Sequence, residues 1–490
     1  MNPTHLHQIA VEAMRSRGLL PAFSPHALQE AEAARHTAPE RSADIRDLRH
    51  LTWFSIDNDD TRDLDQSSVA EPLADGTARL LVAVADVDWL VQQGGAVDDH
   101  AAANTTSVYT AAGIFPMLPE VLSTDLTSLH EGQERLAVVV DMLVAADGTV
   151  AESDIYRALV LNRAKLTYDA VSAWLDGEAA PPPQIASVTG LEEQVRLHDV
   201  LAGKLRQWRQ SRGALNVNTI AARPVFKNGQ LTDLRPDEKN RAKDLIADLM
   251  IATNGATARF LVDQGFPSIR RFLQSPRRWD RIVALAAGHG VALPALPDAL
   301  ALDRFLTARR SADPSGFADL SLAVVKLLGS GEYAAAPARA KGAVSNGDEA
   351  GHFGLAINDY AHSTAPNRRF PDLVTQRLLK AALAREAPPY SAEQLADIAK
   401  HCTLQEDNAS KVERQVLKAA GAYLLHGRIG DVFDAIVTGA APKGTFVRIN
   451  SPLLEGRVVR AFEGLDVGDT LRVRLVAVDA EKSFIDFEPA

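Results

Sequence analysis

Cysteine is almost absent from this sequence. The chain of 490 residues contains one, Cys402, so a disulfide within the chain and a zinc site built from several cysteines are both excluded. Proteins that fold without disulfides are typical of reducing compartments. We therefore expect this protein to work in the cytoplasm.

Long apolar segments are also missing. No run approaches the roughly 18 uninterrupted apolar residues that a membrane-spanning helix requires. The two best candidates, Leu80–Val91 and Leu136–Ala146, are interrupted by Asp86, Asp88 and Asp141. The N-terminus carries charged residues and histidines where a secretory signal peptide has an apolar run. These absences predict a protein that does not associate with a membrane.

Positive charge is in deficit over the chain as a whole. There are 63 acidic side chains against 52 Lys and Arg, which gives a formal net charge of −11 and disfavours a polyanionic partner. Residues 201–281 differ, because they contain 16 Lys and Arg against 7 Asp and Glu. Such a stretch within an acidic protein suits an enclosed channel for a phosphate backbone. A solvated helical face explains the charge equally well, so both interpretations stay open.

What the sequence does contain is enough length for about three domains. Residues 1–46 hold short amphipathic segments, with Ser24-Pro25 as a helix start. They predict a small helical region, either a helix-turn-helix or a brace on the next domain. Residues 47–430 begin with strand-like runs and then become mainly helical, which predicts one large α+β domain.

Residues 431–490 have a different pattern. Short runs rich in Val, Phe and Ile alternate with Gly and Asp, which is the rhythm of an OB-type β-barrel, with an unrelated small barrel as the alternative. The order of glycines and aromatics resembles the ribosomal S-one-type OB fold, a binder of single-stranded RNA. There Phe446 would offer a stacking face, and Arg448 and Arg457 would meet phosphates. The predicted strands are Asp431–Thr438, Gly444–Ile449, Gly456–Arg460, Thr470–Val478 and Ser483–Phe487.

Five aspartates crowd into nine positions directly after the apolar run Leu51–Phe54, at positions 57, 59, 60, 63 and 65. Like charges this close repel one another, and a rigid site tolerates them when cations neutralise them. Magnesium prefers carboxylate oxygens and commonly bridges them to a substrate phosphate. Two such ions about 4 Å apart activate water and stabilise the leaving oxygen in phosphodiester hydrolysis. A solvated acidic turn or a calcium loop is the alternative.

This acidic segment resembles the signature of the ribonuclease II (RNB) catalytic domain, in which four aspartates build the metal site. Asp57, Asp63 and Asp65 fall on the first three positions, and Gln66 stands at the fourth. Several further blocks match in order, and the chain is identified as a member of this family. They are Val82–Val87, Thr105–Tyr109, Phe115–Ser123, Leu126–Leu129, Arg212–Leu215, Leu249–Asn254, His352–Ala356, Tyr360–Leu373 and Gln376–Leu379.

The resemblance implies a role for each matched residue. Asp57, Asp63 and Asp65 would hold magnesium, or manganese in its place, and Asp65 would also orient the attacking water. Gln66 would offer a neutral carbonyl oxygen and weaken one metal site. Arg368 would grip the scissile phosphate, a task that suits a forked and always-charged guanidinium. The expected RNA contacts are Tyr109, stacked on a base near the 3′ end, together with Asp248, Arg368, Arg377, Phe446 and Arg448.

The implied activity is hydrolysis of RNA from its 3′ end to nucleoside 5′-monophosphates by a monomeric enzyme. Family members usually carry two cold-shock domains before the catalytic domain, whereas 56 residues precede Asp57. The predicted partners are therefore single-stranded 3′ ends and also structured RNA. Gln66 prompts a second interpretation, a weak or inactive relative that only binds RNA. An endonuclease or another metal phosphoesterase is a third.

Overall fold

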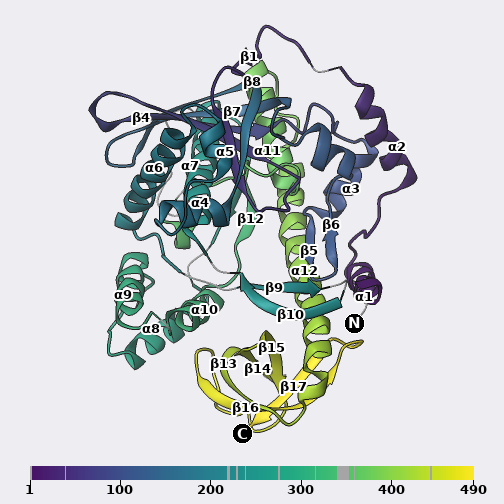
Figure 1. The fold of residues 1–490 in the computed structure, drawn as a ribbon, viewed down its shortest axis with the longest axis vertical. Helices are drawn as coiled ribbons and strands as arrows, with labels where there is room; N and C mark the ends of the chain where they lie inside the picture. The colour runs from purple at the N-terminus through teal and green to yellow at the C-terminus, as the bar shows by residue number, and fades with distance from the viewer. Residues whose placement is uncertain are drawn as a thin grey trace.

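The computed structural model is an α+β protein with a C-terminal β-barrel (Figure 1). In Figure 1 a curled sheet and its helices lie above the barrel, and one long helix, α12, runs down beside both. The predicted fold class is confirmed. The structure describes residues 3–38, 40–217, 221–227, 230–237, 239–273, 276–314, 316–338, 352–357, 359–441 and 444–490.

Two helices, α1 (Pro3–Arg15) and α2 (Pro25–Ala33), open the chain and lead into the short turn η1. Ser24 caps α2 through its side-chain oxygen, as the Ser-Pro start predicts. The apolar face of α1 packs on α12 (Ala392–Leu425), and α2 packs on α3 (Ala96–Asn104). Both helices therefore pack against elements of the large domain that follows them.

The sheet of the large α+β domain has six strands in the order β1-β8-β2-β3-β4-β7. Along its first part β8 pairs antiparallel with β7, and along its last part it pairs parallel with β2, so the sheet curls back on itself. Because β2 and β8 are parallel, their carboxyl ends meet, and the acidic loop after β2 begins there. The strands are β1 (Arg46–Asp47), β2 (Trp53–Asp57), β3 (Gln66–Pro72), β4 (Ala78–Ala85), β7 (Glu134–Val144) and β8 (Val150–Thr167).

Helix α7 (Arg241–Asp263) is the central helix packed on this sheet. Asn240 caps it by accepting a hydrogen bond from the backbone N–H of Lys243. By length and composition it is the one described helix apolar enough to cross a membrane, but 61% of that window is buried inside the protein. It is therefore a core helix. Its neighbours are α4 (Tyr168–Leu175), α6 (Leu191–Ser211) and α11 (Phe370–Ala384), and the short helix α5 (Pro183–Ser187) packs on α6 and β8.

Smaller elements complete the catalytic domain. Three helices, α8 to α10, pack around an apolar cluster of their own. There are also three two-stranded sheets among the described residues. These elements are α8 (Trp279–Gly288), α9 (Ala299–Ala312), α10 (Phe317–Leu328), β5 (Val108–Thr110) with β6 (Gly113–Phe115), β9 (Ala221–Lys227) with β10 (Gln230–Asp237), β11 (Ser268–Phe272) with β12 (Glu332–Ala336), and the short turns η2 (Ala74–Gly76), η3 (Leu122–Leu126), η4 (Phe353–Leu355) and η5 (His426–Arg428).

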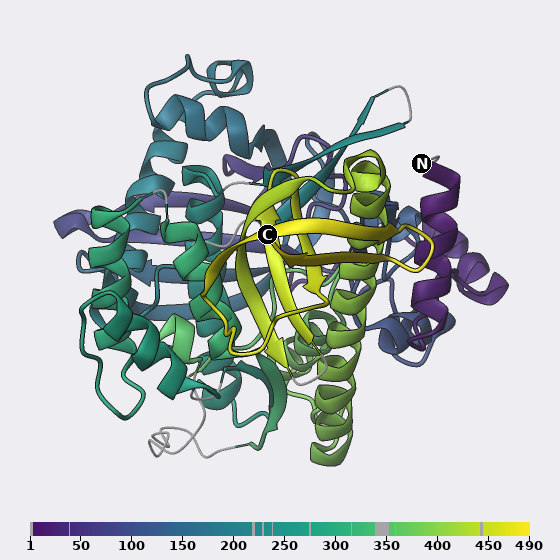
Figure 2. The same ribbon diagram turned by 90° about the horizontal axis from the view of Figure 1, so that it is seen from below.

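The C-terminal strands form a closed five-stranded barrel in the order β13-β14-β15-β17-β16. All five predicted strands are present, and the third begins three residues earlier than predicted, at Leu453. Figure 2 shows α12 lying directly against this barrel, and Ala422 and Leu425 of that helix belong to the barrel's apolar core. The strands are β13 (Val432–Ala441), β14 (Gly444–Asn450), β15 (Leu453–Val458), β16 (Thr470–Asp479) and β17 (Phe484–Pro489).

Candidate active site

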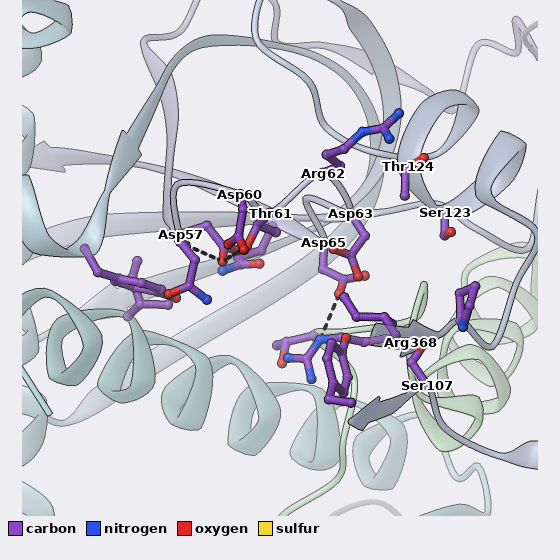
Figure 3. Close-up of a pocket in the computed structure, with 18 of the residues that line it drawn as sticks. Asp57, Asp60, Thr61, Arg62, Asp63, Asp65, Ser107, Ser123, Thr124 and Arg368 are labelled. Carbon is purple, nitrogen blue, oxygen red and sulfur yellow. Dashed lines mark hydrogen bonds and ion pairs between the residues drawn. The ribbon is translucent and has the colours of Figure 1, made fainter. Parts of the chain in front are cut away.

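A cavity of about 710 Å³ opens beside the carboxyl end of β2. The acidic loop after β2 forms one wall, and the β5–β6 hairpin, α4, α7 and the loop before α11 form the others (Figure 3). The structure brings together six of the predicted residues in this one cavity, although they come from three distant parts of the sequence. They are Asp57, Asp63, Asp65, Gln66, Tyr109 and Arg368.

Hydrogen bonds from the Asp57 side chain and from Lys165 hold the first turn of the acidic loop in place. The Oδ1 atom of Asp57 accepts hydrogen bonds from the backbone N–H of Asn58 at 2.8 Å and from the Thr61 hydroxyl at 2.9 Å. The Lys165 ammonium, on β8, donates to the backbone carbonyls of Asp59 at 2.9 Å and Thr61 at 2.7 Å. Sequence reasoning missed Lys165, since nothing local to β8 marks it as a partner of this loop.

Asp65 and Arg368 form the ion pair at the centre of the cavity (Figure 3). Asp65 is 2% exposed, its Oδ1 accepts the backbone N–H of Asn367 at 2.9 Å, and its Oδ2 lies 3.3 Å from Nε of Arg368. The Arg368 side chain is 43% exposed. It therefore keeps most of its fork available to a ligand while one edge contacts the carboxylate.

Burial works against ionisation of the acidic loop. Removal from water raises the pKa of Asp57 and Asp63, and it raises the pKa of Asp65 to about 7 although Arg368 opposes the shift. Six carboxylates line the cavity against four cationic side chains, so its lining is net negative. Such a cavity repels phosphate groups until additional cations enter it. The carboxylates are Asp57, Asp60, Asp63, Asp65, Glu120 and Asp237, and the cations are Arg62, Arg223, Lys243 and Arg368.

The donor chemistry of this wall fits a divalent cation. Asp57, Asp63 and Asp65 offer carboxylate oxygens, the ligands that magnesium prefers. Carboxylates also outnumber cationic side chains in this lining. Their side chains do not converge: over the described ranges, no three His, Cys, Asp or Glu side chains lie close enough together to hold a metal ion. Gln66 lines the same cavity as the first residue of β3, where its backbone pairs with Val84 of β4.

Two tyrosines line the cavity near the acids. Tyr109 is 42% exposed, and its backbone N–H donates to the carboxylate of Glu413 on α12 at 3.0 Å. Tyr168 was not predicted; it is the first residue of α4 and directly follows β8, so the parallel pairing that positions Asp57 also positions this ring. The aromatic rings give the cavity flat surfaces on which bases can stack.

The chain is similar to known proteins over most of its length. The family model of the RNB domain matches residues 45–385, and that of the RNase II-type exonuclease C-terminal S1 domain matches residues 431–490. The chain belongs to the RNB family. Ribonuclease R of Vibrio parahaemolyticus is 29% identical over 479 residues, which cover 90% of this chain and 55% of the relative. Ribonuclease R of Aquifex aeolicus is 29% identical over 510 residues, which cover 98% of this chain and 70% of the relative.

Solved structures share the RNB fold over the whole chain. Mycoplasma genitalium RNase R in complex with ribose-methylated single-stranded RNA superposes with a TM-score of 0.84 at 19% identity, covering 100% of this chain and 78% of that one. The same protein in complex with double-stranded RNA gives a TM-score of 0.82 at 21% identity, covering 100% and 83%. The chain thus spans only part of its relatives, 55% of the length of the Vibrio protein.

Three of the predicted RNA contacts lie outside the cavity beside β2 in this RNB protein. Asp248 faces away from the cavity, where it pairs with Arg206 at 2.7 Å and with Arg209, and its side chain is 5% exposed. Sequence reasoning placed it by a loose match in α7, and it lies on the face of the helix turned to α6. Its carboxylate is therefore paired with two arginines of α6.

Arg377 and Arg448 are likewise neutralised inside the fold. The Arg377 side chain is 3% exposed, its Nε donates to Asp88 at 2.9 Å, and its Nη2 forms an ion pair with Asp98 at 2.8 Å. Arg448 pairs with Asp319 of α10, which ties the barrel to the catalytic domain. Both arginines are therefore paired with carboxylates within the protein. Phe446, by contrast, lines a cavity between the barrel and α12.

The basic stretch at residues 201–281 does not form a channel lining as a unit. Most of its charges meet carboxylates from other elements, and among the described residues of the stretch only the cations Arg223 and Lys243 line the cavity beside β2. This part of the chain therefore carries charges that are largely paired within the protein, an arrangement that neither sequence interpretation described. The pairs include Arg206 and Arg209 with Asp248, Arg241 with Asp199, Lys243 with Asp237, Arg270 with Asp359, Arg271 with Glu406, and Arg281 with Asp466.

Proposed function

We propose that this RNB protein hydrolyses RNA from its 3′ end to nucleoside 5′-monophosphates, with magnesium as cofactor and manganese as a substitute. One observation carries the proposal: the fold gathers Asp57, Asp63, Asp65 and Arg368 in a single cavity although they lie up to 311 positions apart. Family membership supplies the reaction class, because ribonuclease R is the name of the similar proteins.

The aspartates and Arg368 have different roles at the scissile phosphate: the aspartates bind the metal and Arg368 binds the phosphate. Asp57, Asp63 and Asp65 would hold the magnesium, with the carbonyl oxygen of Gln66 as a neutral addition; when bound, magnesium lowers the pKa of water and stabilises charge on the phosphate. Arg368, whose fork is half exposed beside Asp65, draws a non-bridging phosphate oxygen into the cavity. Asp65, fixed by the N–H of Asn367, orients the attacking water.

Tyr109 and Tyr168 provide the recognition of RNA in this proposal. A base has an apolar face whatever its identity, so stacking on these rings holds the terminal nucleotides without choosing a sequence. The pair of RNA complexes of the Mycoplasma protein supports RNA as the substrate class, in single-stranded or double-stranded form.

The decisive experiment is digestion of RNA labelled at its 5′ end, with and without EDTA. In magnesium we expect the 5′-labelled strand to shorten from its 3′ end while mononucleotides are released. In EDTA we expect the labelled strand to stay at full length. Internal fragments of defined length would indicate an endonuclease instead. A second function, RNA binding without hydrolysis, is favoured by Gln66 in place of a fourth carboxylate. Tight binding with no shortening at saturating magnesium or manganese would establish that function.

A further inference from the structure

Helix α7 lies between the proposed catalytic cavity beside β2 and a smaller cavity of about 290 Å³, which we call the arginine pocket. Ile246 and Met250 line the catalytic cavity. Ile251, Gly255 and Arg259 line the arginine pocket, on another face of the same helix. Its other walls are the turn between β7 and β8, the C-terminal end of α6 and the segment after η4. Within the described part of the chain, the two cavities share no lining residue.

The lining of the arginine pocket is net positive. It contains three arginines, Arg209, Arg212 and Arg259, and one carboxylate, Asp359. That carboxylate is already paired, because its Oδ1 lies 3.2 Å from Nη1 of Arg270. Neither Arg212 nor Arg259 has a carboxylate of the described residues within ion-pair distance. The pocket therefore has positive charge available to an anion.

Gly255 gives the Arg259 side chain room on the surface of α7. Glycine destabilises the interior of a helix, yet Gly255 stands inside α7, one turn before Arg259. A Cβ at position 255 would lie 3.3 Å from Nη1 of Arg259, closer than an ordinary contact. The missing side chain therefore lets this guanidinium lie over the helix at the edge of the pocket.

Arg209 brings a buried donor to the same pocket. Its side chain is 10% exposed, and its Nη2 pairs with Asp248. Its Nε is buried as well, and this N–H has no hydrogen-bond acceptor among the described residues. Burial of a charged donor without an acceptor is costly. An anionic oxygen in the pocket would supply that acceptor.

Trp208 gives the arginine pocket a flat surface. The Arg212 guanidinium lies 4.9 Å over the centre of its ring. A planar aromatic ligand stacks on an indole at least as well. By taking that place, it would release the exposed Arg212 for contact with an anionic group of the same ligand. The apolar side chains of the lining are Val150, Leu205, Ile251 and Ile357.

We propose that the arginine pocket binds a nucleoside 5′-monophosphate, with its base on Trp208 and its phosphate among Arg209, Arg212 and Arg259. A planar ring joined to a compact anion matches a lining that combines an indole with forked guanidinium groups. The volume is near the lower limit of about 300 Å³ for small-molecule sites, so it suits one nucleotide and not an RNA strand. The choice of a nucleotide rests on the proposed function, since that reaction releases nucleoside 5′-monophosphates.

The test is equilibrium dialysis of the full chain with adenosine 5′-monophosphate in EDTA, where no hydrolysis is needed. Adenosine and inorganic phosphate are measured in parallel, and we expect each to bind at least about tenfold more weakly than the nucleotide. In the double variant Arg212→Gln, Arg259→Gln, affinity for the nucleotide should fall at least about tenfold, because two charged contacts with the phosphate are lost. Adenosine should bind this variant as it binds the wild type, which a misfolded pocket could not do.

A change at the ring should have the opposite selectivity. Trp208→Leu should weaken the binding of the nucleotide and of adenosine, and leave that of inorganic phosphate unchanged. Arg196→Gln is the matched control, because Arg196 also lies on α6 and over a tryptophan, 4.6 Å from the centre of the Trp174 ring, but outside the pocket. This variant should bind the nucleotide like the wild type.

Arg368→Gln shows whether the nucleotide binds in the catalytic cavity instead. In EDTA we expect this variant to bind adenosine 5′-monophosphate like the wild type. Loss of binding in Arg368→Gln together with retention in the double variant would overturn the inference, as would a wild type that does not bind the nucleotide saturably. Digestion of labelled RNA is a separate measurement, so the proposed function and the arginine pocket can fail independently.

Discussion

The backbone N–H of Asn367 donates a hydrogen bond to Oδ1 of Asp65 at 2.9 Å, across 302 positions of sequence. The side-chain carbonyl of the same Asn367 accepts the Thr127 hydroxyl at 2.6 Å. Next to Thr127, the Ser128 hydroxyl oxygen accepts the backbone N–H of Leu64 at 2.9 Å. Thr127 and Ser128 are buried. They therefore fix the position of the acidic loop relative to the loop before α11, which carries Arg368.

Thr127→Val should therefore lower kcat more than it changes KM. Valine keeps the shape of threonine but loses the hydroxyl that fixes Asn367, so Asp65 and Arg368 lose their shared support. A displacement of about 1 Å at reacting groups costs on the order of 100-fold in rate, and we expect a loss of about 10- to 100-fold. Single-turnover hydrolysis measures it. Thr127→Ser keeps the hydroxyl and should recover most of the rate; an unaffected valine variant would contradict the assignment.

Asp65→Asn should abolish hydrolysis while RNA binding stays near normal. The carboxylate serves the chemistry, and its removal also reduces repulsion among Asp57, Asp63 and the RNA phosphates, so affinity is unchanged or higher. We expect kcat to fall on the order of 1000-fold or more. Turnover and affinity are measured on the same labelled RNA, the latter in EDTA. Near-normal turnover in the variant would remove Asp65 from the reaction.

The same substitution should change how stability depends on pH in the absence of metal. The pKa of Asp65 rises from an ordinary value of 3.8 to about 7 in the folded protein. Between these values the folded state retains a proton that the unfolded chain releases, so stability is greatest at low pH within this window and falls as pH rises through about 7. In EDTA, Asp65→Asn should melt at least about 2 °C above the wild type at pH 8, and the difference should shrink toward pH 5. An equal difference at both pH values would argue against the shift.

Gln66→Asp should lower the magnesium concentration that gives half-maximal activity. The added carboxylate increases the negative charge beside the proposed metal ligands, and we expect a change of several-fold. The measurement is the initial rate of mononucleotide release over a magnesium titration. Gln66→Glu is a useful companion, because its longer side chain adds the same charge at a different reach. If neither variant changes the titration midpoint, Gln66 does not contact a metal.

Features encoded by neighbouring residues could be predicted from the sequence. The barrel strands follow from short apolar runs separated by Gly and Asp, and the acidic loop from five aspartates within nine positions. The third barrel strand shifted because Leu453 and Leu454 continue the pairing with β14 before Gly456. In each case the signal lies within a few residues of the structure that it specifies.

Contacts between distant residues could not be predicted. An arginine that meets RNA and one that meets a buried carboxylate look alike in sequence, and only the fold brings Asp319 to Arg448 or Arg206 to Asp248. Lys165 is hidden for the same reason, since its partners are backbone carbonyls of a loop more than 100 positions away. Such pairings depend on helix and strand packing that no local pattern reports.

Helix α12 contributes to three apolar clusters, one of which it shares with α1. Leu395 and Cys402 near its start lie in the core of the catalytic domain, whereas Ala422 and Leu425 near its end lie in the core of the barrel. The fit there is close, because a Cβ added at Gly421 would overlap the side chain of Leu454. Heat should therefore melt the barrel and the catalytic domain in one calorimetric transition. A fragment of residues 431–490 would lack one wall of its own core and would expose apolar surface to water.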